Sequence, residues 1–505
     1  VLDPQGVAQP TYYANSPQLR KFVDTLPGLG QAGANNLGSY LPVAVPDTTT
    51  YPGADYYEIA IVEYTQRLHT DLQKATKLRG YVQKIAGVNG TPMYLGPVIV
   101  AHRDRPVRVK VFNELQTGIP FFIPVDATVM GAGKGNLQAD GVTPCDPLDP
   151  AQAPLCASYS EQRVGVHLHG GLTPWISDGL PHQWIAPAGD PSPYKVGVGA
   201  RDVPDMAQDQ VNYLPSGGAM SLYYPNQQSG RLMFYHDHAY GLTRLNVYAG
   251  VAAGYLLRDD VETALTAGVE DLPLVVQDKS FVPSDIAVQD SKWDLAKWGQ
   301  PGDLWFPHMY EENQDPTCSW DINCMNPLGR WDYGPWIWPP VQLPGNPVNP
   351  SAALTASIVP EAFMDVMMVN GTVYPKAVVQ PKAYRLRILN ASNDRFLNLQ
   401  LYYAIKGATF DTTRRAYFDR VTGTACIGAA GTPAECTEVA MVPRNGDTYT
   451  TVWGDDSTVP FDGRPGGVPN PVNAGPKMFQ IATEGGLLPA AVLKNAPPIP
   501  VTYDT

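Results

Sequence analysis

The chain has 505 residues, of which 44% are hydrophobic and 10% aromatic, and this content excludes a disordered protein. Its 50 Pro and 47 Gly residues favour short strands joined by turns over long helices. A formal net charge of −13 argues against nucleic acid and anionic membrane surfaces as partners. No run reaches the roughly 18 consecutive apolar residues of a membrane span.

The start of the chain and its cysteines both favour export. The first residue is Val1 rather than Met, which indicates a removed export signal, with an engineered start as the plain alternative. Three local cysteine couples are typical of small-loop disulfides in an oxidising compartment. A thiolate metal site is the alternative, but no Cys-X-X-Cys occurs and no His lies beside a Cys. We therefore expect a secreted, periplasmic or cell-surface protein. The couples are Cys145/Cys156, Cys318/Cys324 and Cys426/Cys436.

The first clear strand covers residues 106–113, where apolar and basic residues alternate with a period of two. Residues 384–390 repeat this pattern. When Arg108 is aligned with Arg385, every position to the end of the strand agrees in character, and each copy ends in Asn. Such a distant repeat indicates two copies of one β-domain, and chance recurrence is the alternative.

Residues 232–235 and 247–257 are apolar runs of strand length. Together with the repeat they predict an all-β protein of two tandem domains, 1–260 and 261–505. The stretch over 290–350 is rich in Trp and Pro and reads as a long irregular insertion in the second domain.

Four of the eight histidines form two His-X-His pairs, His167/His169 and His236/His238. Because alternate residues of a strand face the same side, each pair can direct two imidazoles at one metal cluster. Neutral imidazole suits both Cu(I) and Cu(II). Asp237, inside the second pair, is expected to point away from the metal as a supporting group. The pairs therefore predict a copper site.

The other histidines are isolated, and lone histidines are more often structural than ligands. None of them forms the His-Cys-His strand that a blue copper site uses. They are His69, His102, His182 and His308.

These motifs resemble a known family. Residues 167–179 and 234–239 resemble the first and second copper motifs of multicopper oxidases, the group of laccases, bilirubin oxidases and spore-coat oxidases. The resemblance to the bacterial spore-coat and phenoxazinone-synthase branch continues through residues 57–69 and 241–250. Residues 368–375 and 479–486 resemble the family's second domain.

The resemblance implies tandem cupredoxin-like Greek-key domains, of the sandwich or barrel type, and a role for each ligand. His167 would bind the type 2 copper, and His169, His236 and His238 the type 3 pair. Asp178, nine residues after His169, matches an acid that helps to deliver protons to the trinuclear site. Its plain alternative is a turn residue in the sequence Ser-Asp-Gly.

The family's third and fourth motifs have no counterpart here. In the family, a C-terminal cupredoxin domain supplies four more trinuclear histidines and the Cys and two His of the type 1 copper. No histidine follows His308, and none lies near Cys426 or Cys436. The second domain is therefore expected to be incomplete at its C-terminus and the type 1 domain to be missing.

We hypothesise that this is the large chain of a two-chain multicopper oxidase. A second polypeptide, from a cleaved precursor or a separate gene, would carry the type 1 copper and complete the trinuclear site. The enzyme would couple one-electron oxidation of phenols, aminophenols, a bilin or a metal ion to four-electron reduction of O2 to water.

Two alternatives stay open. One is a non-enzymatic, secreted copper-binding or scaffold protein, including a homo-oligomer that pairs its half-sites. The other is a plain β-sandwich binding protein whose histidine pairs are structural. A smaller second band in electrophoresis and an absorption band near ~600 nm would favour the two-chain oxidase.

Overall fold

The computed structural model describes residues 16–17, 19–125, 127, 131–207, 217–289, 293–306, 364–393, 395–397, 399–402, 408–411, 416–419, 441–442, 468–469 and 475–494. The chain forms two compact units, Val1–Arg395 and Phe396–Thr505. The domain boundary expected near residue 260 stays a prediction, and most of the expected insertion lies outside the described residues. Among the described residues, no helix combines the length and apolar character needed to cross a membrane.

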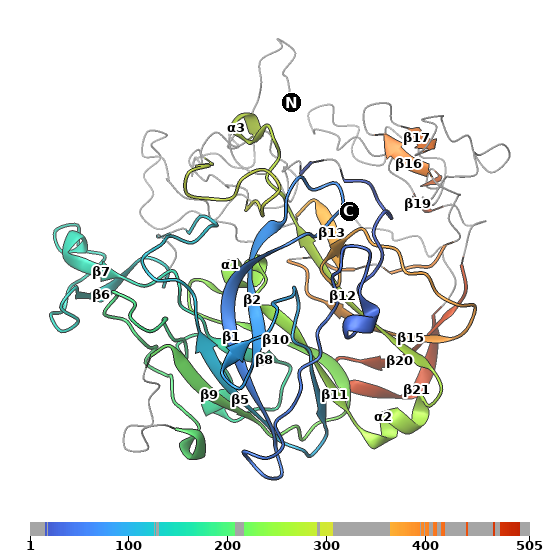
Figure 1. The fold of residues 1–505 in the computed structure, drawn as a ribbon, viewed down its shortest axis with the longest axis horizontal. Coiled ribbons are helices and arrows are strands. Elements are labelled where there is room, and N and C mark those ends of the chain that lie inside the picture. The colour runs from blue at the N-terminus through green and yellow to red at the C-terminus, as the bar shows by residue number, and fades with distance from the viewer. Residues whose placement is uncertain are drawn as a thin grey trace, which may run out of the picture. The chain divides into compact units, whose positions relative to one another are not determined.

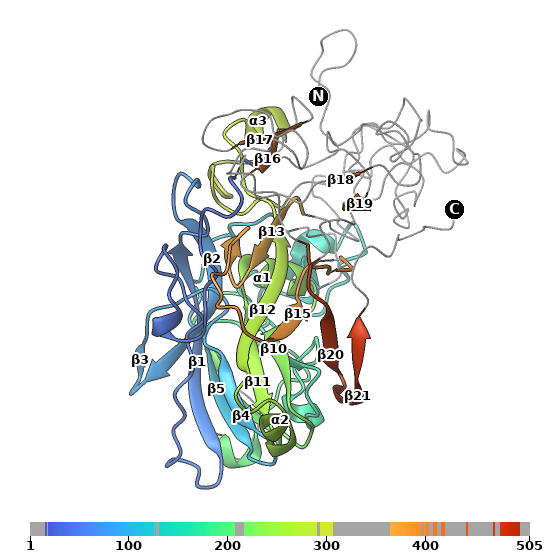
Figure 2. The same ribbon diagram turned by 90° about the vertical axis from the view of Figure 1, so that its right-hand side faces the viewer.

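The first unit contains two sheets that share a core, and the second of them includes the strands of both histidine pairs (Figure 1, Figure 2). The first has the order β3-β2-β1-β5-β9, built from β1 Asp55–Gln66, β2 Thr76–Ile85, β3 Val88–Asn89, β5 Val107–Asn113 and β9 Ala219–Tyr224. The second has the order β4-β11-β10-β8, built from β4 Ile99–His102, β8 Val166–His169, β10 Arg231–Asp237 and β11 Ala252–Arg258.

One hydrophobic core joins these two sheets. The alternation seen in the sequence directs Val107, Val109 and Val111 of β5 inward, where each is at most 3% exposed. The same core contains buried residues from strands of both sheets, among them Leu168 of β8 and Tyr235 of β10. The strand predicted over 106–113 is confirmed, and the arrangement is a β-sandwich.

The repeated sequence pattern forms a strand with similar pairing in a third sheet. This sheet has the order β14-β13-β12-β15 and consists of β12 Glu270–Lys279, β13 Val366–Val369, β14 Thr372–Val373 and β15 Tyr384–Asn390. Strand β5 pairs in parallel with β1, and β15 pairs in parallel with β12. On their other sides, β1 and β12 pair antiparallel with β2 and β13. The shared topology supports two copies of one β-arrangement.

In the second copy, the basic side chains of the alternation face inward. In β15, Arg385 and Arg387 are 7% and 9% exposed, while Leu386 and Ile388 are 38% and 42% exposed. Both arginines form ion pairs with Glu262, and with Asp271 of β12 at 2.8 and 3.0 Å. Burying these charges is tolerable because each has an opposite charge beside it.

Helices are short, and the described residues are mainly in strands and loops, so the all-β prediction is confirmed. The α-helices are α1 Thr243–Ala249, α2 Asp260–Leu265 and α3 Ile286–Gln289, and the 3₁₀ turns are η1 Gln31–Gly33, η2 Ala153–Leu155, η3 Trp175–Ser177 and η4 Pro204–Met206. Two-stranded pairs are β6 Lys134–Gln138 with β7 Cys156–Ser158, β16 Ala408–Asp411 with β17 Ala416–Asp419, β18 Met441–Val442 with β19 Val468–Pro469, and β20 Met478–Thr483 with β21 Gly486–Lys494.

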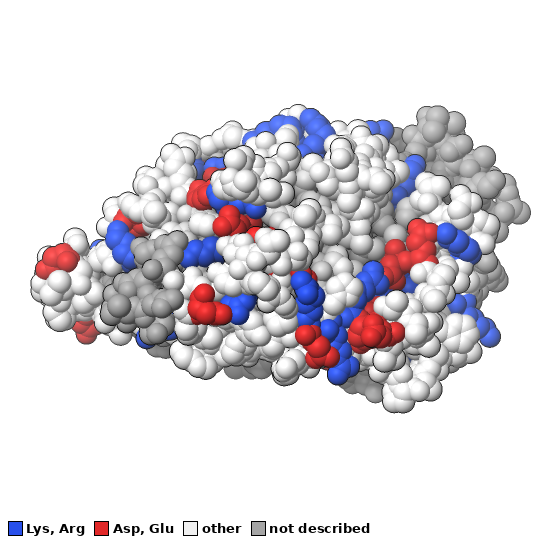
Figure 3. All heavy atoms as spheres, turned by 60° about the horizontal axis from the view of Figure 1, so that its bottom comes forward, with Lys and Arg blue, Asp and Glu red and all other residues white. Residues whose placement is uncertain are grey.

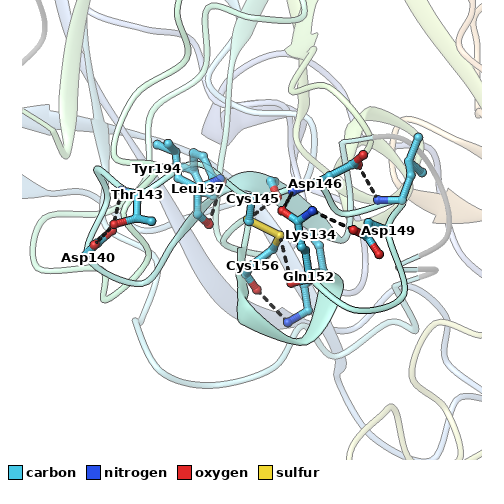
Figure 4. The surroundings of a disulfide bond; sticks show 12 residues. Lys134, Leu137, Asp140, Thr143, Cys145, Asp146, Asp149, Gln152, Cys156 and Tyr194 are labelled. Carbon is cyan, nitrogen blue, oxygen red and sulfur yellow. Dashed lines mark hydrogen bonds between the residues drawn. A yellow bond between two sulfur atoms is a disulfide. The ribbon is translucent and has the colours of Figure 1, made fainter.

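A disulfide joins Cys145 to Cys156 at the β6–β7 hairpin (Figure 4). Lys134 of β6 donates from Nζ to the carbonyl of Cys156 at 2.7 Å. This confirms one of the three predicted couples, while the couples 318/324 and 426/436 lie outside the described residues.

Charged side chains of opposite sign lie next to one another on the face drawn in Figure 3. The net charge of −13 is therefore not gathered into a single-sign field on that face.

Lys279, the last residue of β12, is a lysine buried in the protein interior. The residue is 3% exposed, and Nζ donates to the carbonyl of Tyr248 at 2.7 Å. Burial lowers the pKa of Lys279 to about 7, against a smaller raising effect of Asp278. The unfolded chain keeps this proton up to a pKa of about 10.4. Between pH 7 and about pH 10.4 the unfolded chain therefore binds more protons than the folded chain. The free energy of unfolding must rise with pH in this range.

We expect the free energy of unfolding to rise by about 1–2 kcal/mol more between pH 7 and pH 9 in the wild type than in Lys279→Met. Urea titrations at three pH values measure this, with Lys297→Met, at an exposed lysine, as the control. If the free energy of unfolding changed with pH in the same way in the wild type and in Lys279→Met, the amine of Lys279 would not be buried and partly neutral.

Candidate metal centre

Strands β8 and β10 bring the two histidine pairs together. They pair antiparallel, with His167 opposite His236 and Phe234 opposite His169. Leu168, between the first two histidines, is 2% exposed in the sandwich core. His167 and His169 therefore face away from the core, as the period of two predicts.

The four imidazoles form one group. Ring centres lie 5.0 Å apart for His167 and His238, 5.5 Å for His167 and His236, and 5.3 Å for His169 and His236. One ligand nitrogen from each of His167, His169 and His236 lies within 4.8 Å of the other two. This convergence of nitrogens from neighbouring strands is what a shared metal cluster requires.

The loop after the first pair orients two of the rings. The carbonyl of Asp178 accepts a hydrogen bond from Nδ1 of His167 at 2.5 Å, and the carbonyl of Gly179 accepts one from Nδ1 of His238 at 2.8 Å. With the proton held on Nδ1, Nε2 of each ring is free to bind a metal. Gly179 has φ +72°, and an added Cβ would lie 2.0 Å from the carbonyl oxygen of Val166. Only glycine fits this close approach.

The other two rings meet at the centre of the group. Nδ1 of His236 donates to the carbonyl of Asp237 at 2.6 Å, which leaves Nε2 as its ligand atom. That Nε2 lies 3.1 Å from Nδ1 of His169. His169 therefore turns Nδ1 toward the group.

Three of the four imidazoles have a lowered pKa, which favours the neutral form that binds metal. Burial, reinforced by the neighbouring imidazoles, lowers the pKa of His236 to about 3. Burial likewise lowers the pKa of His169 and of His238. Neutral rings with converging lone pairs are the donors that copper accepts in either oxidation state, so copper fits this group.

Phe234 is a site residue that the sequence analysis missed. Its ring stacks on His169 at 4.9 Å and 18° and on His236 at 4.8 Å and 28°. It lies two residues before His236, on the same face of β10, and this spacing could have identified it.

Asp178 lies directly after η3, at the edge of the group. Its Oδ1 accepts a hydrogen bond from Oγ1 of Thr173 at 2.7 Å and lies 3.6 Å from Nδ1 of His167. The residue thus makes the local turn contact of the plain alternative and also stands beside a ligand. Its part in proton delivery stays a prediction.

Asp178→Asn separates these two roles. The hydrogen bond to His167 comes from the main-chain carbonyl of Asp178, and an amide oxygen can still accept from Thr173. We therefore expect an unchanged copper content but oxygen consumption reduced by about 100-fold, the scale of a lost acid–base group. Metal analysis and an oxygen electrode on the holoprotein measure both quantities, with Asp104→Asn, at a 69% exposed aspartate, as the control. Loss of copper, or an unchanged rate, would refute the proton-delivery role.

None of the isolated histidines within the described residues joins the group. His69 is fully buried, and both its nitrogens are engaged: Nε2 with a main-chain carbonyl at 2.9 Å, and Nδ1 as acceptor from the N–H of Asp71 at 3.0 Å. His102 is exposed at the end of β4, and His182 lies against Tyr240. His308 lies outside the described residues.

Relatives of known class match this chain. No protein-family model matches it. It is 30% identical over 385 residues to a laccase of Bacillus stratosphericus and 29% identical over 386 residues to a laccase of Bacillus subtilis. Each match covers 76% of this chain and 52% of the relative. A multicopper oxidase of Arabidopsis thaliana, LPR1, is 28% identical over 321 residues, which are 62% of this chain and 41% of the relative.

The chain belongs to the multicopper oxidase family, as its motifs predicted. It spans about half the length of the curated relatives it matches. Solved multicopper oxidases from Pediococcus acidilactici and Aquifex aeolicus align with TM-scores of 0.36 and 0.34 at 16% identity. These alignments cover 76% and 74% of this chain and 49% and 47% of the solved chains, and scores this low add nothing to the assignment.

Proposed function

We propose that this chain supplies one side of the trinuclear copper site of a multicopper oxidase. The enzyme would couple one-electron oxidation of a reducing substrate to four-electron reduction of O2 to water. The observation that carries the proposal is the convergence of imidazole nitrogens from both His-X-His pairs. Family membership supports a copper-dependent oxidase chemistry.

In this proposal His167 holds the type 2 copper, and His169, His236 and His238 hold the type 3 pair. Bound copper would store the electrons that oxygen reduction requires. The chain's own groups act around it: the carbonyls of Asp178 and Gly179 keep two rings in the ligating tautomer. Phe234 stacks on the rings of His169 and His236 and restricts their rotation.

The remaining ligands would come from another polypeptide segment, which carries the type 1 copper. The group offers four imidazoles, whereas the family's trinuclear site uses eight. Large apolar side chains are exposed in the loop that follows His169: Leu172 at 62%, Trp175 at 63% and Leu180 at 44%. Exposed apolar residues beside an open ligand group support a protein surface docking there. A cleaved precursor or a separate gene could equally supply this segment.

The reducing substrate would be a phenol, an aminophenol, a bilin or a metal ion. We also propose that the protein acts outside the cytoplasm, at the cell surface, in the periplasm or as a secreted protein. The disulfide between Cys145 and Cys156 supports an oxidising compartment.

The test uses protein purified from its native source. We expect denaturing electrophoresis to show a second, smaller chain, absorption near ~600 nm from a thiolate-bound copper, and oxygen consumption with a phenolic donor. Copper bound by this chain alone, without the absorption band and without oxygen consumption, would instead indicate a copper-binding or scaffold protein.

A further inference from the structure

Asp237 lies between two ligands but faces away from them. It is the last residue of β10, so its side chain points to the opposite side from His236 and His238. The side chain is 0% exposed. A carboxylate buried so completely needs partners for both oxygens.

Both oxygens accept main-chain hydrogen bonds at positions that flank the histidine pairs. Oδ1 accepts from the N–H of Gly165 at 2.9 Å, and Oδ2 accepts from the N–H of Ala239 at 3.1 Å. Gly165 lies two residues before His167, and its own carbonyl accepts the N–H of His238 at 3.1 Å. One carboxylate thus ties the strand of the first pair to the turn that follows the second.

The segment held by Asp237 also begins α1. The carbonyl of Ala239 accepts hydrogen bonds from the N–H groups of Leu242 at 2.9 Å and Thr243 at 3.0 Å. Asn246 of α1 donates to the carbonyl of Arg163 at 3.0 Å. The turn after His238 is therefore fixed on one side by the carboxylate and on the other by the helix.

We propose that Asp237 is a positioning residue of the metal centre, which sets the distance and register between the two histidine pairs. This inference rests on the proposed copper site, but not on oxidase turnover, because it concerns metal binding by this chain. Partners outside the ligand shell commonly change metal affinity by about 10–100-fold when they are removed.

The test is Asp237→Asn in the full chain, titrated with Cu(II) alone. An amide nitrogen cannot accept a hydrogen bond, so one of the two main-chain N–H groups loses its acceptor. We expect the affinity for Cu(II) to fall by about 10–100-fold and the hyperfine pattern of the bound Cu(II) in electron paramagnetic resonance to change.

Asp202→Asn is the matched control. Asp202 is also buried, at 4% exposed. It accepts hydrogen bonds from the N–H and the Oγ of Ser221, each at 2.8 Å, but it flanks no histidine. We expect it to lose stability without losing Cu(II) affinity. Equal Cu(II) affinity and spectra for the wild type and Asp237→Asn, or an equal loss of affinity in both variants, would overturn the inference.

A second measurement needs no variant. In the metal-free wild type, we expect the amides of Gly165 and Ala239 to exchange slowly with deuterium. Rapid exchange at both amides would show that the carboxylate does not hold them and would overturn the inference. Failure of the full oxidase to consume oxygen, with Cu(II) binding intact, would count against the proposed function alone.

Discussion

His236→Ala should lower the affinity of the chain for Cu(II) by more than 100-fold, beyond the loss typical of a partner outside the ligand shell. His236 is the most buried of the four imidazoles, at 7% exposed, and its Nε2 faces His169 at the centre of the group. Its low pKa of about 3 keeps the ring neutral at any ordinary pH. Removing it therefore removes a ligand for which protons do not compete.

The measurement is calorimetric titration of the full chain with Cu(II) at neutral pH. His102→Ala is the control, because His102 is exposed at the end of β4 and outside the group. We expect the control to bind Cu(II) as the wild type does. An affinity for Cu(II) in His236→Ala within a factor of three of the wild type would show that the pairs do not form one site.

The second large effect is on stability. Arg79 of β2 is fully buried, and burial lowers its pKa to about 10. Its guanidinium donates to Oε1 of Glu63 at 3.1 and 3.0 Å and to Oδ1 of Asn246 at 3.1 Å. It also lies 3.6 Å from the ring centre of Phe121. Arg79→Met leaves these oxygens without their donor, and we expect it to lower the free energy of unfolding by about 3–5 kcal/mol.

Urea unfolding compares this variant with Arg20→Met. Arg20 forms an ion pair with Asp71 at 2.5 Å, but its side chain is 59% exposed. An exposed pair of this kind contributes at most about 1 kcal/mol. If the two substitutions lowered the free energy of unfolding by similar amounts, Arg79 would not be part of a stabilising buried network with Glu63 and Asn246 of α1.

The sequence predicted that the two histidine pairs would lie together because the main signal for this arrangement is local. His-X-His in a strand fixes the direction of two side chains, and this follows from the period of two alone. The same reasoning predicted that Asp237 would face away from the imidazoles, and it could have found Phe234. Sequence spacing was sufficient wherever one strand determines the geometry.

Contacts between distant segments were not predictable in this way. Asp237 accepts the N–H of a residue that lies 72 positions earlier. The hydrogen bonds that orient His167 and His238 come from main-chain carbonyls of the loop at 178–179, and no side-chain identity encodes them. In this loop the sequence gives one local indication, the glycine at position 179, because glycine readily adopts the left-handed backbone found there.

The repeated strand shows a second limit of sequence reasoning. The alternation of β15 correctly indicated a strand, and its pairing with β12 matches that of β5 with β1. The alternation alone does not say which face lies inward. Glu262 and Asp271 decide this, because they place acidic groups beneath Arg385 and Arg387.

The central claim is that the two histidine pairs form one side of a single copper site. The most direct test is a crystal structure of the copper-replete protein with anomalous scattering recorded at the copper edge. Anomalous peaks should lie within about 2 Å, the usual metal–imidazole bond length, of the ligand nitrogens of His167, His169, His236 and His238. Copper-replete crystals without a peak among these four side chains would contradict the claim.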